Sequence, residues 1–200
     1  MNGQDNNQSL WAENIIIADA DHLDRVAFDL TVNFERMLNR RIPKADLARW
    51  IDCIALDGGI REGDHHTNVI FIHSKEKTAF DNFTPSHLSE EINGQAFRDN
   101  LGEFTLSAIP IETGVGGERL LIDTVSFICQ QKEVKRVMVA ADEDKEWDDL
   151  RHLLRDVDDE KRITLFAMQP MPGGNFRQEL LGYSLMSALG IRGEELDGIK

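Results

Sequence analysis

Short apolar runs alternate with longer amphipathic stretches along most of the chain. The apolar runs are uninterrupted, which is typical of strands buried on both faces, and they occupy 15–18, 68–74, 103–111, 136–141 and 163–168. The stretch after the first run repeats apolar residues at helical spacing, at Val26, Leu30, Phe34, Met37 and Leu38. The alternation predicts a three-layer, Rossmann-like α/β fold whose central sheet has about five mostly parallel strands.

Two further helices are expected from their boundary residues. One spans 43–56, with Pro43 in its first turn and a glycine pair after its end. The other spans 176–189 near the end of the chain. Its apolar face indicates that it either covers the core or forms a contact in a homodimer.

We interpret residues 13–200 as one domain preceded by a disordered tail at 1–12, which is polar and lacks the apolar core of a signal peptide. No stretch is long and apolar enough to cross a membrane. Cys53 and Cys129 lie in separate apolar patterns and are expected to be free thiols, which is typical of a cytoplasmic protein.

The formal net charge of −14 restricts the partners of this chain. An acidic surface repels polyanions, so we expect an anionic substrate to need a locally favourable site and a divalent cation. Two basic clusters stand out, one at Arg40, Arg41 and Lys44, and one at Lys132, Lys135 and Arg136. The second precedes a predicted strand, which places it at the edge of the sheet opposite the strand ends.

Carboxylates follow two of the predicted strands. The first strand runs into Asp19 and Asp21, and the fourth runs into Asp142, Glu143 and Asp144. Ligands of open α/β sheets bind beyond the carboxyl ends of the strands. Crowded carboxylates stay ionised only when a cation compensates them, and oxygen ligands suit Mg²⁺ or Mn²⁺. If the two strands are neighbours, this edge has the composition of a metal site for phosphoryl chemistry.

The order and spacing of these acidic motifs resemble the NYN branch of the PIN-like nucleases. The segment 19–23, Asp-Ala-Asp-His-Leu, is similar to that family's first motif, and Ala-Asp-Glu-Asp at 141–144 is similar to its later one. Asp123 lies 19 positions before Asp142, in the helix that the family also places there. The resemblance covers roughly 14–168.

The resemblance implies a PIN-like fold and a site of four metal-binding, catalytic aspartates: Asp19, Asp123, Asp142 and Asp144. It also implies Mg²⁺ or Mn²⁺ as cofactor, single-stranded RNA as substrate and phosphodiester hydrolysis as the reaction. The chain departs from the family at His22, where the family has asparagine, at Lys145, where it has an aromatic residue, and in the glycine-rich loop 114–117.

Two alternatives accompany the nuclease hypothesis. The departures also fit a catalytically inactive member that serves as a binding or assembly module. The third hypothesis is a haloacid-dehalogenase-like phosphatase, in which Asp19 would be the nucleophile, Asp21 the acid, Ser74 the phosphate ligand, Lys135 the charge balancer and Asp142 a magnesium ligand.

Overall fold

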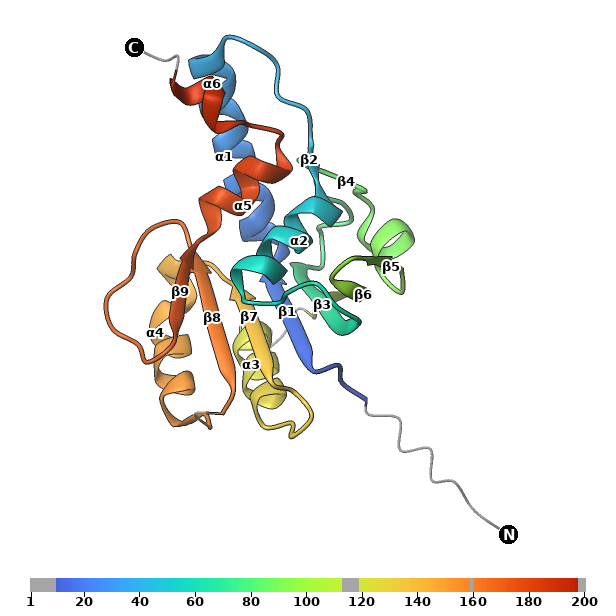
Figure 1. Ribbon diagram of the computed structural model, residues 1–200, viewed down its shortest axis with the longest axis vertical. Coiled ribbons are helices and arrows are strands. Elements are labelled where there is room, and N and C mark those ends of the chain that lie inside the picture. The colour runs from blue at the N-terminus through green and yellow to red at the C-terminus, as the bar shows by residue number, and fades with distance from the viewer. Residues whose placement is uncertain (1–9, 113–118, 159, 198–200) are drawn as a thin grey trace.

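The computed structural model describes residues 10–112, 119–158 and 160–197 (Figure 1). Its strands are β1 Asn14–Asp19, β2 Ala45–Asp46, β3 His65–Ser74, β4 Phe83–Thr84, β5 Ala96–Asp99, β6 Gly102–Ile111, β7 Arg136–Ala140, β8 Arg162–Ala167 and β9 Arg177–Leu180. Its α-helices are α1 Ala20–Leu38, α2 Leu47–Asp57, α3 Leu120–Cys129, α4 Glu143–Leu153, α5 Leu181–Ala188 and α6 Gly193–Asp197. One π-helical turn, η1 Leu88–Ile92, and one 3₁₀ turn, η3 Leu154–Asp156, complete the described elements.

The central sheet has the strand order β5-β6-β3-β1-β7-β8-β9, and every pairing except β5 with β6 is parallel. The predicted mostly parallel sheet is confirmed, and each of the five predicted strands is present. The predicted number of strands is wrong, because seven strands form the described sheet. β2 and β4 form a separate pair.

The two missed strands lie at the edges of the sheet, where the sequence signal is weakest. β5 is a four-residue antiparallel strand whose side chains are exposed or half-buried, so it lacks an apolar run. β9 occupies the first part of the helix predicted at 176–189: Arg177–Leu180 pairs with β8, and helix α5 begins only at Leu181. The helix predicted from Pro43 begins instead after Asp46, whose side chain caps it.

Helices cover both faces of the sheet, and β1 shows how the alternation of side chains divides the core. Ile16 and Ala18 pack into a cluster with buried residues of α1, α2 and α5. Ile15 and Ile17 point the other way and pack into a second cluster with α3 and α4. Burying β1 on both faces explains its uninterrupted apolar sequence.

Two residues at the end of the predicted tail make contacts within the domain. The amide of Ala12 donates a hydrogen bond of 2.8 Å to Oδ1 of Asn68. The ring of Trp11 meets Phe127 edge to face, with 6.1 Å between the ring centroids. Residues 1–9 of that prediction lie outside the described part. No helix among the described residues has the length and apolar character that a membrane span requires.

The sheet reverses its winding at β1. Successive strands run from β1 to β3 on one side, whereas β7 pairs with β1 on the other. Such a switch point separates the loops that leave the two strands and opens a crevice at their carboxyl ends. In this fold the switch point, and with it the expected position of that crevice, lies where β1 and β7 run into α1 and α4 (Figure 1).

Candidate functional site

Two aspartates occupy equivalent positions on either side of the switch point. Asp19 ends β1 and caps α1, accepting a 2.9 Å hydrogen bond from the amide of His22. Asp142 follows β7 and caps α4, accepting a bond of 3.2 Å from the amide of Asp144. Because β1 and β7 are adjacent, with Ala18 opposite Ala140, the expected meeting of the two acidic strand ends is confirmed.

A compact cluster of His22, Asp142 and Glu143 lies in the crevice. Nε2 of His22 is 3.5 Å from Oε2 of Glu143, and Nδ1 of His22 is 3.8 Å from Oδ2 of Asp142. One ligand atom from each of the three residues lies within 4.8 Å of the others. The three side chains are 5%, 4% and 8% exposed, respectively. Nε2 of His22 and Oε2 of Glu143 are buried and have no hydrogen-bond partner among the residues that the structure describes.

Cations of the chain already neutralise part of this cluster. Nη2 of Arg25 lies 2.8 Å from Oδ2 of Asp142, and Nζ of Lys145 lies 3.3 Å from the same oxygen. Burial opposes ionisation of Asp142, but the hydrogen bond from Arg25 and the charge of Lys145 favour it, and the pKa of Asp142 lies below the ordinary value. Asp142 is therefore ionised at neutral pH.

His22 is a neutral imidazole in this environment. Burial lowers its pKa and outweighs the nearby charges of Asp142 and Glu143. Nη2 of Arg25 lies 2.9 Å from Nδ1, and a guanidinium can only donate, so Nδ1 accepts and the ring proton belongs on Nε2. Nε2 then points its proton toward Glu143 without forming a hydrogen bond.

Two further carboxyl groups have pKa values above their ordinary range. Burial raises the pKa of Asp19, although the amide of His22 partly offsets the effect. Burial and the charge of Asp19 raise the pKa of Glu146 to about 7. Oε2 of Glu146 accepts a 2.9 Å hydrogen bond from the amide of Asp142, so this side chain belongs to the same edge. A carboxyl group with such a pKa can exchange a proton near neutral pH.

The other acids after β1 are structural. Asp21 accepts hydrogen bonds of 2.7 Å from both the amide and the hydroxyl of Ser74, which ties α1 to the end of β3. Asp24 is 3% exposed and binds Nζ of Lys77 at 2.6 Å, together with the amides of Asp81 and Asn82 at 2.9 Å. Both side chains fasten the segment after β3 to α1.

The four predicted site residues do not form one cluster. Asp19 and Asp142 lie at the crevice, whereas the side chains of Asp123 and Asp144 are exposed. Asp123 lies on α3, and within the described residues neither it nor the Asp144 carboxylate makes an ion pair. Arg119, four residues before Asp123, forms an ion pair with Asp149 at 3.8 Å. The predicted glycine-rich loop 114–117 lies outside the described residues.

Sequence reasoning missed Glu146 and interpreted His22 only as a departure from a motif. It named Glu143 among the acids after the fourth strand but did not include it in the four-residue site. Their positions in the sequence could have identified them, since His22 lies directly after Asp19 and Asp21 and Glu143 lies directly after Asp142. The motif comparison drew attention to aspartates instead.

The phosphatase hypothesis is not supported by the geometry. Lys135, its charge balancer, directly precedes β7 and so lies at the opposite edge of the sheet from Asp19. Ser74, its phosphate ligand, donates its hydroxyl to Asp21. The structure therefore does not place Lys135 beside Asp19.

Comparison with known proteins gives a family without an assigned function. A family of unknown function (DUF6621) matches residues 8–196. No curated protein and no solved structure matches the chain.

Proposed function

The chain belongs to the DUF6621 family of unknown function, and we propose from the geometry of its site that it is a divalent-metal-dependent ribonuclease. The observation that carries the proposal is the pair of buried, unpartnered atoms, His22 Nε2 and Glu143 Oε2, next to the ionised Asp142. Buried polar atoms without partners destabilise a fold, and a shared cation would satisfy both. The position of these residues at the switch point of a mostly parallel sheet is consistent with this proposal.

The donor set fits a first-row divalent cation. His22 supplies a neutral nitrogen, and Asp142 and Glu143 supply carboxylate oxygens, a mixture that suits Mn²⁺ better than Mg²⁺. If Nε2 held a cation, the ring proton would be on Nδ1, and Arg25 would lose its contact with Nδ1. Arg25 can keep its bond to Asp142, because the same Nη2 atom already lies 2.8 Å from that carboxylate.

The chain's own residues provide the remaining requirements of phosphodiester hydrolysis. A bound cation would lower the pKa of a coordinated water and offset charge on the phosphate. Glu146, with a pKa of about 7, can accept the proton of an attacking water. Arg25 and Lys145 are 51% and 68% exposed, so their charges can also face an anionic substrate.

A second candidate function is favoured by one observation. Asp142 is already paired with Arg25 and Lys145, so it is compensated without any metal. Acidic residues that are neutralised by the chain's own arginine and lysine need no metal, which is expected of a non-catalytic binding or assembly module. The two candidates differ in whether an added cation displaces those pairs.

The test is cleavage of a labelled single-stranded RNA in the presence of Mn²⁺ by the wild type, by Glu143→Gln and by Asp144→Asn. Glutamine retains an oxygen to accept the 3.0 Å hydrogen bond from the Met168 amide, so the fold is preserved. We expect Glu143→Gln to lower the cleavage rate by about a hundredfold or more. The matched Asp144→Asn variant should retain activity, because that side chain is exposed. Absence of cleavage by the wild type would contradict the ribonuclease proposal and favour the non-catalytic binding or assembly module.

A further inference from the structure

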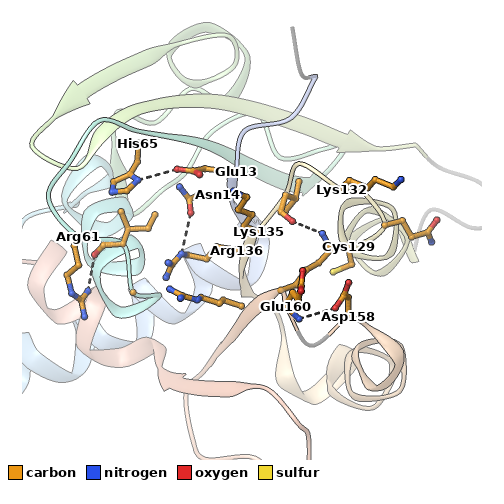
Figure 2. A pocket seen from close by; sticks show the side chains of 16 residues that line it. Glu13, Asn14, Arg61, His65, Cys129, Lys132, Lys135, Arg136, Asp158 and Glu160 are labelled. Atoms are coloured by element: carbon orange, nitrogen blue, oxygen red, sulfur yellow. Dashed lines mark hydrogen bonds and ion pairs between the residues drawn. The ribbon is translucent and has the colours of Figure 1, made fainter. Parts of the chain in front are cut away.

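A second site lies at the amino edge of the sheet, away from the acidic crevice. It is a cavity of about 940 Å³ bounded by the starts of β1, β3, β7 and β8. Figure 2 shows Arg61 and Arg136 on one side of it, beside His65 and Glu13. The described residues that line it include six basic side chains, namely Arg61, Lys132, Lys135, Arg136, Lys161 and Arg162, against three acidic ones, Glu13, Asp158 and Glu160. This excess is the reverse of the whole chain, whose net charge is −14.

Arg136, at the centre of this basic group, is fixed by neutral acceptors. Its Nη1 donates to the carbonyl of Gly58 at 2.6 Å, and its Nε donates to Oδ1 of Asn14 at 3.3 Å. Gly59 has a φ of 94° and passes so close that a Cβ there would lie 2.5 Å from Nη1. The guanidinium is thus held in place while its charge stays uncompensated by these contacts.

Neighbouring arginines add to the same charge. Nη1 of Arg61 donates to the carbonyls of Leu56 and Ile60, at 3.0 and 2.9 Å, so backbone oxygens orient this side chain as well. Neither Arg61 nor Arg162 forms an ion pair within the described part of the chain. Burial, followed by the charges of Arg162 and Arg61, lowers the pKa of Arg136. The charge of Glu13 opposes this effect only in part, and a bound anion would relieve the remaining repulsion among the arginines.

We propose that this cavity binds the polyphosphate group of a small molecule, such as a nucleoside di- or triphosphate. Guanidinium groups match the geometry of phosphate oxygens, and Arg61, Arg136 and Arg162 all line this cavity. The volume lies within the range of small-molecule sites. A long nucleic-acid backbone fits less well, because Asp158 and Glu160 line the other side of the cavity (Figure 2).

This site is independent of the proposed ribonuclease activity. Arg136 begins β7 and Asp142 follows its end, so the two sites lie at opposite ends of the same strand. Ligand binding at this cavity should therefore not depend on the residues of the acidic site, and either proposal can fail without the other.

The test is calorimetric titration of pyrophosphate and of ATP into the full chain at low salt, with a chelator present so that no divalent cation contributes. We expect saturable binding, weakened at least about tenfold in the Arg61→Gln/Arg162→Gln double variant. Both side chains are exposed, so the fold should persist, which circular dichroism would verify. The matched control is Arg41→Gln/Arg155→Gln, which removes two exposed arginines outside this cavity and should bind within about twofold of the wild type.

Three results would overturn the proposal. One is the absence of saturable binding of either probe below about 1 mM. Another is unchanged affinity in both the double variant and the single charge reversal Arg162→Glu. The third is tighter binding of a short single-stranded RNA than of ATP, lost in the same double variant, which would assign the cavity to nucleic acid.

Discussion

Nε2 of His22 lies 3.5 Å from Oε2 of Glu143, and neither buried atom has a hydrogen-bond partner in the described part of the chain. The two residues come from different helices, α1 and α4, which begin where adjacent parallel strands end. The sheet thus brings together two potential metal ligands that are 121 positions apart in the sequence. Their unsatisfied state, beside the ionised Asp142, is the basis for proposing a metal site.

Removing Asp24 should destabilise the fold more than any change to an exposed acid. Burial opposes its ionisation, but hydrogen bonds from Lys77, Asp81 and Asn82 outweigh burial and hold its pKa below the ordinary value. Asp24→Ala leaves the Lys77 charge and two amides without their acceptor, so we expect the free energy of unfolding to fall by about 3 kcal/mol. Urea unfolding measures this. Asp29→Ala, exposed on the same helix, should change it by less than about 0.5 kcal/mol.

Asp52 should make stability fall as the pH rises toward neutrality. Burial and the neighbouring carboxyl of Asp99 raise its pKa to about 7, from an ordinary value of 3.8. Between these values the folded chain keeps a proton that the unfolded chain has released, so raising the pH favours unfolding.

The Asp52→Asn variant should remove this loss, because asparagine stays neutral at every pH. We expect it to be more stable than the wild type at pH 8 by about 1 kcal/mol, a value reduced because Asp52 is only partly buried. Thermal unfolding between pH 4 and pH 8 measures the effect. An equal decline in both proteins would show that Asp52 is not responsible.

Lys145 should compete with a cation for Asp142. Its Nζ lies 3.3 Å from Oδ2 of Asp142, and its side chain is 68% exposed. Lys145→Gln removes a positive charge beside the site, so we expect Mn²⁺ to bind about threefold more tightly. Calorimetry with Mn²⁺ measures the change. Lys44→Gln, which removes an exposed charge elsewhere, is the control; an equal gain in both variants would indicate only a general effect of net charge.

Asp123 should contribute little to cation binding, although the family resemblance includes it in the site. Its side chain is exposed on α3, and it is not a member of the cluster of His22, Asp142 and Glu143. We expect Asp123→Asn to keep the Mn²⁺ affinity within about twofold, whereas Asp142→Asn should lower it at least tenfold. Equal losses in the two variants, measured by the same titration, would restore Asp123 to the site.

The sequence predicted the centre of this fold better than its edges. Strands buried on both faces, such as β1, are uninterrupted apolar runs and can be recognised without tertiary information. β5 and β9 are short edge strands with exposed or half-buried side chains. Their sequences carry no strand pattern, and they are recognised only by their pairing with β6 and β8. Arg177–Leu180 also precedes an apolar helical pattern directly, so periodicity could not separate the two elements.

The candidate site was predictable only in part, for a related reason. Asp19 and Asp142 were found because acids that follow buried strands must lie at the same edge of a parallel sheet. The direction in which a helix turns its first residues depends on its packing, which the sequence does not show. That direction places Glu143 in the crevice and leaves Asp144 in solvent.

Calorimetric titration of Mn²⁺ into the wild type and into Glu143→Gln tests the central claim most directly. The account predicts saturable binding by the wild type at submillimolar Mn²⁺ and at least a tenfold loss of affinity in the variant, whose folded state circular dichroism would confirm. Absence of binding by the wild type at millimolar Mn²⁺, or equal binding by the two proteins, would contradict it. His22 and Glu143 would then be an unsatisfied pair in a site closed by Arg25 and Lys145.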